Sequence, residues 1–198
     1  MAKTHTSTSI EDVPGGVRIT MPVPSSGCVS IFLAVWLTSW AVGEFSAIRG
    51  LLSVGTASAP ASAFMLFWLV GWTLGGIIAI GAFAMSLGGL EIVTVADGVI
   101  RRRAEAFGVG LSWRYPLERC SNFRPTGGEA SAKTFVSFDH VTAKGDTTVR
   151  FGSGLTESRA EEIAERVWAE FPQLMPDHER RKREREAAPQ TPPIQPSV

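Results

Sequence analysis

Two long apolar runs constrain this chain more than any other feature of its sequence. They cover residues 28–48 and 63–87, and each reaches about 20 residues, the length of helix that crosses a hydrocarbon core. The runs share a phrase, because Trp-Leu-Thr-Ser-Trp-Ala-Val-Gly at residues 36–43 is matched by Trp-Leu-Val-Gly-Trp-Thr-Leu-Gly at residues 68–75. The sequence therefore predicts an integral membrane protein with two related spans.

Basic residues predict the orientation of these spans. The short connection between the two runs carries only Arg49, whereas Lys3 and Arg18 precede the first run and three arginines follow the second at residues 101–103. Lys and Arg near the ends of spans favour the cytoplasmic side of the membrane. We therefore expect a helical hairpin in the inner (cytoplasmic) membrane, a multi-pass arrangement with both termini in the cytoplasm.

Small residues recur at four-residue spacing in both spans. Small side chains let helices approach closely in lipid, where no hydrophobic force drives helices together. We therefore expect a packing seam within the hairpin or a face for self-association. Inverted repeats of this kind also occur in transporters, but two helices enclose no substrate path, so a carrier would need an oligomer. The residues of the predicted seam are Ser39, Gly43 and Ala47 in the first span and Gly71, Gly75 and Ala79 in the second.

Four tryptophans occupy matching positions in the two spans. Trp36 and Trp40 lie one helical turn apart, as do Trp68 and Trp72. Trp68 suits an interfacial belt, whereas the other three lie nearer the middle of the membrane, where each indole N–H needs an acceptor. These residues are predicted to contact each other, a partner helix or lipid, and a pocket for a pigment or quinone is the alternative.

Glu44 is the only ionisable side chain inside a predicted span. A carboxyl group at such a position is a functional candidate, for proton transfer or for coupling to a partner. Its place about one turn from the outer end of the first run also allows contact with headgroup water or Arg49. An interfacial anchor is therefore the competing hypothesis.

Composition argues against several functional classes. The chain has 19 basic and 19 acidic residues, so no net field attracts nucleic acid. Cys28 and Cys120 alone imply no disulfide framework, and none of the three scattered histidines has a cysteine at metal-ligand spacing. We therefore expect no nucleic-acid partner, no cofactor, no metal site and no catalytic residues, and we classify the chain as non-enzymatic.

A small cytoplasmic domain is predicted after the hairpin. β-Branched residues at 90–96 and the turn signal Asp97-Gly98 predict a β-hairpin with residues 99–107. Residues 157–171, preceded by Thr156 as N-cap, predict an amphipathic helix whose apolar stripe closes a curved antiparallel sheet. Further strands are expected at residues 111–117, 120–124, 135–141 and 147–151.

Two positions in this domain are candidate binding sites. Arg101, Arg102 and Arg103 are close enough to the second span to contact anionic lipid at the membrane surface. The glycine-rich approach to the helix is a candidate anion-binding loop, with an ordinary turn and helix cap as the alternative. The residues of that loop are Gly152, Ser153 and Gly154.

Composition divides the chain into five predicted segments. They are a disordered tail (residues 1–15), a short strand with its lead-in (16–26), the transmembrane hairpin (27–88), the cytoplasmic domain (89–173) and a charged, proline-rich disordered tail (174–198).

Several phrases between residues 16 and 173 carry a resemblance to a known family. They are Gly-Val-Arg-Ile-Thr-Met-Pro at 16–22, the Trp-rich spans, Gly-Leu-Glu-Ile-Val-Thr-Val at 89–95, the Arg-rich strand at 99–107, Trp-Arg-Tyr-Pro-Leu at 113–117 and Val-Arg-Phe-Gly-Ser-Gly-Leu at 149–155. In these phrases the chain resembles small bacterial two-span membrane proteins with a pleckstrin-homology-like (PH-like) domain. The resemblance implies an α+β membrane protein, in which a transmembrane helical hairpin is followed by a curved antiparallel sheet capped by a C-terminal amphipathic helix. It implies no established activity.

The functional expectation follows from this architecture. We expect an integral membrane protein that presents its PH-like domain for protein or membrane-surface interaction, as a scaffold or accessory subunit. A ligand-binding membrane sensor or an oligomeric small-molecule carrier is the alternative. The expected partners are membrane lipids and either a protein partner or a second copy bound through the hairpin.

Overall fold

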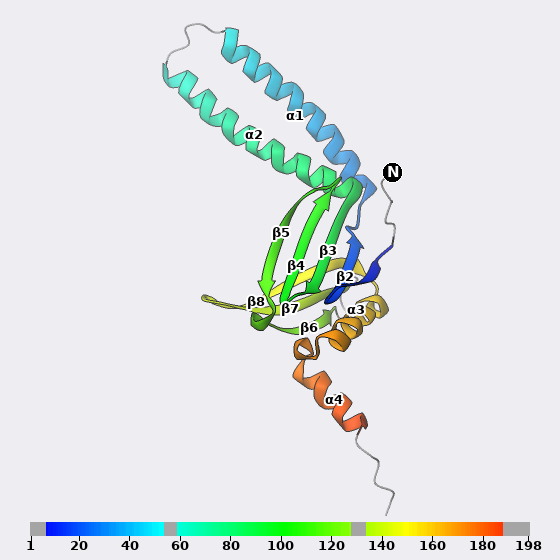
Figure 1. Cartoon of the computed structure of the whole chain (residues 1–198). Coiled ribbons are helices and arrows are strands. Elements are labelled where there is room, and N and C mark those ends of the chain that lie inside the picture. Colours follow the sequence, from blue (N-terminus) through cyan, green and yellow to red (C-terminus); the bar gives the residue numbers. More distant parts are fainter. Residues whose placement is uncertain (1–6, 54–58, 128–133, 188–198) are drawn as a thin grey trace, which may run out of the picture. The chain divides into compact units, whose positions relative to one another are not determined.

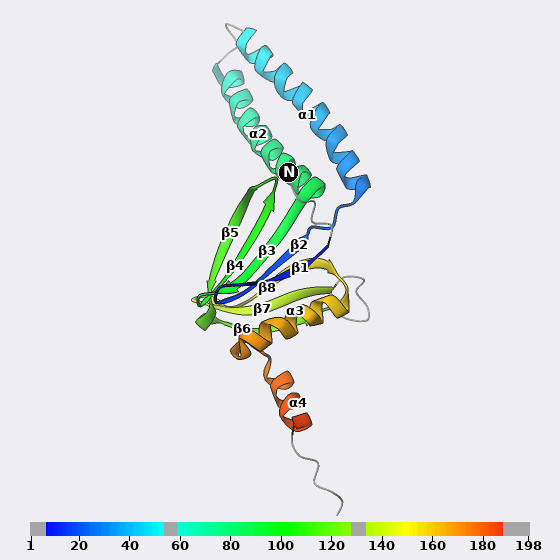
Figure 2. The same cartoon turned by 45° about the vertical axis from the view of Figure 1, so that its right-hand side comes forward.

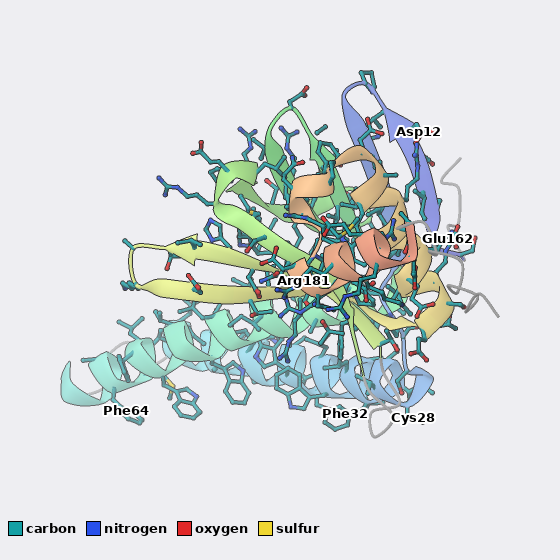
Figure 3. All side chains as sticks on the ribbon, turned by 90° about the horizontal axis from the view of Figure 1, so that it is seen from below. Asp12, Cys28, Phe32, Phe64, Glu162 and Arg181 are labelled. Atoms are coloured by element: carbon teal, nitrogen blue, oxygen red, sulfur yellow. The ribbon has the colours of Figure 1, made fainter. Side chains whose placement is uncertain are left out.

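A computed structural model describes residues 7–53, 59–127 and 134–187 of the chain. Its two long helices are α1 (Gly27–Ser53) and α2 (Ala59–Gly88), which run beside each other and contain both predicted spans (Figure 1). Two antiparallel sheets and a C-terminal helix complete the expected α+β layout. Aromatic side chains such as Phe32 and Phe64 project away from the two helices (Figure 3).

The helical hairpin interrupts a five-stranded sheet. The strands lie in the order β1-β2-β3-β4-β5, so β2, which precedes α1, is the neighbour of β3, which follows α2. The Val23 amide donates a hydrogen bond of 2.9 Å to the Gly89 carbonyl, which holds the entry to α1 beside the exit from α2. The five strands are β1 (Ser9–Val13), β2 (Gly16–Pro22), β3 (Gly89–Ala96), β4 (Val99–Ala106) and β5 (Val109–Pro116).

Two tight turns join β3, β4 and β5. Asp97 and Gly98 adopt φ values of 50° and 71°, which confirms the predicted turn. Phe107 and Gly108 form a second turn with φ values of 53° and 83°. The sequence placed Phe107 in a strand, because a large aromatic residue rarely adopts a positive φ.

The remaining strands form a second sheet, whereas a single curved sheet was expected. Pro116 and a short 3₁₀ turn at Leu117–Arg119 separate β5 from β6, because proline supplies no amide for a ladder. The second sheet has the order β6-β7-β8 and is antiparallel throughout (Figure 2). Its strands are β6 (Cys120–Thr126), β7 (Thr134–Thr142) and β8 (Gly145–Leu155).

The predicted amphipathic helix is α3 (Glu157–Glu170). Thr156 occupies the N-cap position, as expected, but its hydroxyl makes no capping hydrogen bond. The apolar stripe is buried, and the helix packs on β6 and β7. Trp168 fixes this contact because its indole N–H donates a hydrogen bond of 2.8 Å to the Phe123 carbonyl.

The chain forms two compact units, and strands β1 to β5 contribute to both. The hairpin unit contains Thr20–Ile92 and Arg102–Trp113, and therefore both long helices. The core unit contains Ile10–Ile19, Val93–Arg101 and the chain from Arg114 onward. Its buried side chains come from β2, β3, β4, the whole second sheet and α3. They include Val17, Ile19, Val93, Val95, Ile100, Phe123, Val136, Phe138, Phe151, Ile163 and Val167.

Both predicted tails contain regular structure. Ser9–Val13 form β1 in the region expected to be disordered, and the Arg166 guanidinium pairs with Asp12 of that strand. The short strand predicted at residues 16–22 is β2, and it joins the sheet. Beyond the 3₁₀ turn Pro172–Leu174, the charged run forms α4 (Asp177–Ala187), within which Arg183 pairs with Glu165 of α3. Both segments were expected to be disordered because neither shows a periodic pattern of apolar residues. In the structure, each forms an ion pair with a side chain of α3.

Candidate functional site

Glu44 of α1 faces Thr73 of α2 inside the hairpin. The Thr73 hydroxyl oxygen lies 2.5 Å from Glu44 Oε1 and 2.8 Å from the Leu69 carbonyl oxygen of its own helix. Glu44 Oε2 is buried without a hydrogen-bond partner among the residues that the structure describes. Arg49, the expected alternative partner of Glu44, instead lies over the Phe45 ring at 5.2 Å from its centroid.

The Thr73 hydroxyl has two hydrogen-bond acceptors within reach. A threonine hydroxyl has one proton, and two oxygens lie within donating distance of it. The hydroxyl therefore shares its proton between Glu44 Oε1 and the Leu69 carbonyl oxygen, as the hydrogen-bond donor to both. The pair of Glu44 and Thr73 links α1 to α2 by a polar contact within the hairpin.

Two tryptophans of the predicted set join the helices. The Trp40 indole N–H donates a hydrogen bond of 3.3 Å to the Trp72 carbonyl, which supplies the acceptor expected for a mid-span tryptophan. Trp68 and Trp72 are stacked with their ring centroids 5.6 Å apart. Trp36 is partly exposed on α1. The four tryptophans therefore divide between helix contact and the outer surface.

The hairpin seam differs from the predicted small-residue ladder. A Cβ atom built at Gly43, Gly71 or Gly75 meets no described atom within 4 Å. The opposite helix therefore does not approach these glycines closely. At Gly76, by contrast, a Cβ would lie 2.1 Å from the Trp40 ring. The close contact is displaced by one residue because the Trp40 side chain, which is larger than any seam residue, fills the space.

The contacts along the observed seam follow one antiparallel register. Near the helix ends that adjoin the sheet, the hydroxyls of Ser30 and Ser86 lie 3.1 Å apart. Trp40 packs on Gly76, and Glu44 meets Thr73 further along. Ser39 donates a hydrogen bond to the Val35 carbonyl of its own helix. Ala47 and Ala79, the remaining members of the predicted ladder, are half-buried, and self-association through the ladder stays a prediction.

The three arginines of β4 differ in their surroundings. Arg102 forms an ion pair of 2.6 Å with Glu91 and lies over the Trp113 ring. Arg103 pairs with Glu105 at 2.6 Å and donates a hydrogen bond of 3.2 Å to the Gly108 carbonyl. Arg101 is exposed. Their lipid contact stays a prediction, and two of the three guanidinium groups already have carboxylate partners.

The predicted anion loop is part of a strand. Gly152, Ser153 and Gly154 lie in β8, where the register skips from Val136 opposite Phe151 to Thr134 opposite Leu155. These three residues therefore form a bulge, and Gly152 and Gly154 adopt the positive φ values of 69° and 89° that it needs. A bulge within a strand stands where a turn and helix cap were the alternative, and anion binding stays a prediction.

Sequence reasoning missed a polar cluster on the second sheet. Asp139 of β7 accepts hydrogen bonds from Arg124 at 2.9 Å, from Asn122 at 3.0 Å and from Thr148 at 2.8 Å. Burial alone raises the pKa of Asp139, but these hydrogen bonds and the Arg124 charge outweigh it and lower that pKa below its ordinary value. The donors come from β6 and β8, so no local sequence pattern identifies the cluster.

Comparisons with known proteins give no family. No protein-family model matches the chain, and no curated protein is significantly similar to it in sequence. Within the described residues, no three His, Cys, Asp or Glu side chains are grouped so as to hold a metal ion.

Proposed function

We propose that the chain is a two-span integral membrane protein that presents its sheet domain for interaction with proteins or with the membrane surface. The exposure of the long helices carries this proposal. The candidate spans, Gly27–Leu52 and Ala63–Gly88, have mean hydropathies of 1.6 and 2.0. Even so, 0% of the apolar stretch of the first span and 6% of that of the second are buried. A core helix of a water-soluble protein buries its apolar side chains, whereas these helices expose theirs outside the seam between them, as a lipid environment requires.

The strand pairing supports a hairpin whose two ends lie on the same side of the membrane. β2 enters α1 and β3 leaves α2, and these strands are neighbours in one sheet. A sheet cannot continue through the hydrocarbon core with open edges, so the paired strands belong on one face of the bilayer. Basic residues flank this end of the hairpin, which favours the cytoplasmic face of the inner membrane.

The domain on that face is proposed to be PH-like and to act as a scaffold or accessory subunit. Two antiparallel sheets and the packing of α3 on β6 and β7 support this proposal. Its partners would be membrane lipids together with a protein or a second copy that contacts the outer surface of the hairpin. A non-enzymatic role is part of the proposal.

A ligand-binding sensor or an oligomeric carrier is the second candidate. It would require a closed polar pocket at Glu44 or at the β8 bulge. One surface hollow on α1, among the described residues, is lined by apolar side chains such as Val42 and Phe45, with Phe83 from α2, and it includes neither site. An acyl chain or an apolar helix suits that hollow better than a polar ligand.

Cysteine labelling tests the topology. In spheroplasts that produce the full chain with Cys28→Ser, a Gly55→Cys variant places a thiol in the connection between the helices, and Ser112→Cys places one on β5. We expect a membrane-impermeant maleimide to label Gly55→Cys directly and Ser112→Cys only after permeabilisation. Labelling of both without permeabilisation, or of Ser112→Cys alone, would overturn the proposed topology.

Purification of the full chain in lipid nanodiscs then separates the two candidate functions. Mass spectrometry of what copurifies should find a stoichiometric protein for a scaffold or accessory subunit. A homo-oligomer that retains a small molecule would favour the sensor or carrier.

A further inference from the structure

Strand β5 and the turn before it carry an exposed apolar stripe. Phe107 is 73% exposed, Val109 80%, Leu111 70% and Trp113 40%. All four belong to the hairpin unit. We call these four residues the β5 stripe. Contiguous exposed apolar side chains of this size mark a contact surface rather than ordinary surface scatter.

The β5 stripe lies on one face of an edge strand. Residues 109, 111 and 113 alternate along β5 and therefore point to the same side of the sheet. A Cβ at Gly110 would touch Glu105, and Arg102 lies over Trp113, so β4 and β5 share one antiparallel register. That register sets Ala104 and Ala106 beside the stripe. Small neighbours leave the larger side chains of β5 uncovered.

The stripe continues from the end of α2. A Cβ at Gly88 would lie 3.3 Å from the Phe107 ring, so the turn between β4 and β5 touches the last residue of the candidate span. Leu87, one residue earlier, is 56% exposed. Exposed apolar side chains therefore occur at the end of α2, at the adjoining turn and along β5.

The backbone of Phe107 gives an independent indication. Its φ of 53° is a left-handed conformation that glycine or asparagine adopts readily and that a bulky residue adopts only with backbone strain. Within the fold, this side chain touches the end of α2 and remains mostly exposed. The strain is therefore consistent with a contact that the phenyl ring makes outside the chain.

We propose that the β4–β5 hairpin lies in the membrane interface, with the β5 stripe inserted at the boundary between headgroups and acyl chains. This inference rests on the proposed two-span function, because α2 must leave the bilayer at Gly88 for Phe107 to meet lipid. Trp113, with the Arg102 guanidinium over its ring at 5.4 Å from the centroid, has the amphipathic character that suits this boundary.

Lipid is a better occupant than a second copy of the chain because of where the stripe begins. The stripe begins at the end of the candidate span, which is the level where the bilayer ends. Lipid therefore reaches it whether or not a second copy of the chain is bound.

Fluorescence quenching in vesicles tests this proposal. The full chain with Cys28→Ser would carry one added cysteine, labelled with an environment-sensitive fluorophore, in phosphatidylcholine and phosphatidylglycerol vesicles that contain nitroxide lipids. Leu111→Cys reports the stripe, Ser112→Cys is the matched control on the opposite face of the same strand, and Ile78→Cys reports the span. Cys120 can remain, because burial raises the pKa of its thiol to about 11 and suppresses labelling at neutral pH.

The expected result is that nitroxides near the headgroups quench the label at residue 111 roughly twofold more than the label at residue 112, as interfacial burial implies. Equal quenching at these two positions, with quenching retained at residue 78, would overturn the interfacial insertion and leave the two-span function intact. No quenching at residue 78 would overturn the two-span function itself. A shielded label at residue 111 that lipid does not quench and that responds to the protein-to-lipid ratio would indicate a second copy and overturn the lipid assignment.

A second variant guards against effects of folding. Phe107→Asn removes the apolar tip but supplies a residue that accepts the left-handed conformation, so the turn should be retained. We expect it to reduce quenching at residue 111 without changing quenching at residue 78. Unchanged quenching at residue 111 would contradict the role of Phe107 as the inserted tip.

Discussion

The α1–α2 hairpin and the core unit use the same kinds of side chain in opposite directions. In the core unit, Phe138 and Val136 of β7 are fully buried. In the hairpin, Phe67 and Ile78 point outward and remain exposed. Burial from water stabilises the first region, whereas the second has little interior, which suits the lipid environment proposed for it. The difference shows that apolar content alone does not identify a core, and that exposure in the fold does.

The internal contacts of the two regions also differ in kind. The core unit is joined by rings in contact, such as Phe138 and Phe151 with centroids 6.2 Å apart. The hairpin is joined by a few polar bonds, among them the bond from Trp40 to Trp72 and the pair of Glu44 and Thr73. In lipid, polar bonds and close packing replace the hydrophobic effect as the source of helix association.

Removing one large aromatic ring from each region should give the largest difference in stability between the two regions. Phe138→Ala empties a fully buried site and should destabilise the core unit by about 3–5 kcal/mol. Phe67→Ala truncates a side chain that is 79% exposed and should leave the protection of both units nearly unchanged. Hydrogen exchange of the full chain in detergent, read on peptides from β7 and from α2, measures both. A comparable loss of protection in the two variants would contradict the contrast between the regions.

Adjacent glycines in α2 should respond in opposite ways. Gly76→Ala pushes a methyl group into the Trp40 ring and should destabilise the hairpin by about 1–3 kcal/mol. Gly75→Ala places its methyl group in open space and should be neutral or stabilising by up to about 1 kcal/mol, because alanine favours helix. Unfolding in mixed micelles of increasing denaturing-detergent fraction compares them. A larger loss from Gly75→Ala would restore the predicted small-residue seam in place of the observed one.

The sequence was sufficient for the elements whose signals are local. Two apolar runs, the turn at Asp97 and Gly98 and the stripe of α3 each depend on neighbouring residues, and the structure confirms all of them. The hairpin seam was misplaced because helix rotation depends on the volume of Trp40, which belongs to the opposite helix. Spacing of small residues along one helix does not contain that information.

Contacts that cross the chain were also beyond a sequence reading. β1 has two acidic residues in five and no apolar alternation, and its Asp12 pairs with Arg166, which is more than 150 positions away. The Asp139 cluster gathers its donors from two other strands. Such sites have no signal within a window of sequence, because the fold alone brings their members together.

Thr73→Val should test whether polar bonds hold the hairpin. Valine keeps the shape of threonine but leaves the Glu44 carboxyl without its partner on α2, which should cost about 1 kcal/mol of hairpin stability. Thr38→Val is the matched control, because the Thr38 hydroxyl bonds to the Ala34 carbonyl of its own helix and, among the described residues, to no group on α2. Energy transfer between dyes at the two helix ends reports separation of α1 and α2. Equal separation of the helices in the two variants would mean that the hydrogen bond between Thr73 and Glu44 does not stabilise the hairpin.

Asp139→Asn should have the smallest effect, and the size of that effect depends on pH. The folded pKa of Asp139 lies below the unfolded value of 3.8, so its contribution to stability is complete above that value and is lost as the pH falls below it. Because the Arg124 and Asp139 side chains are partly exposed, the loss near neutral pH should be below about 1 kcal/mol. Asp146→Asn, an exposed carboxylate on β8, is the control. Urea unfolding of the core unit within the full chain, from about pH 6 to about pH 3, should show the difference between Asp139→Asn and the unaltered chain shrink with acidity. A difference that grows as the pH falls would mean that the cluster stabilises the protonated carboxyl, and that burial, rather than Arg124 and its neighbours, dominates the pKa of Asp139.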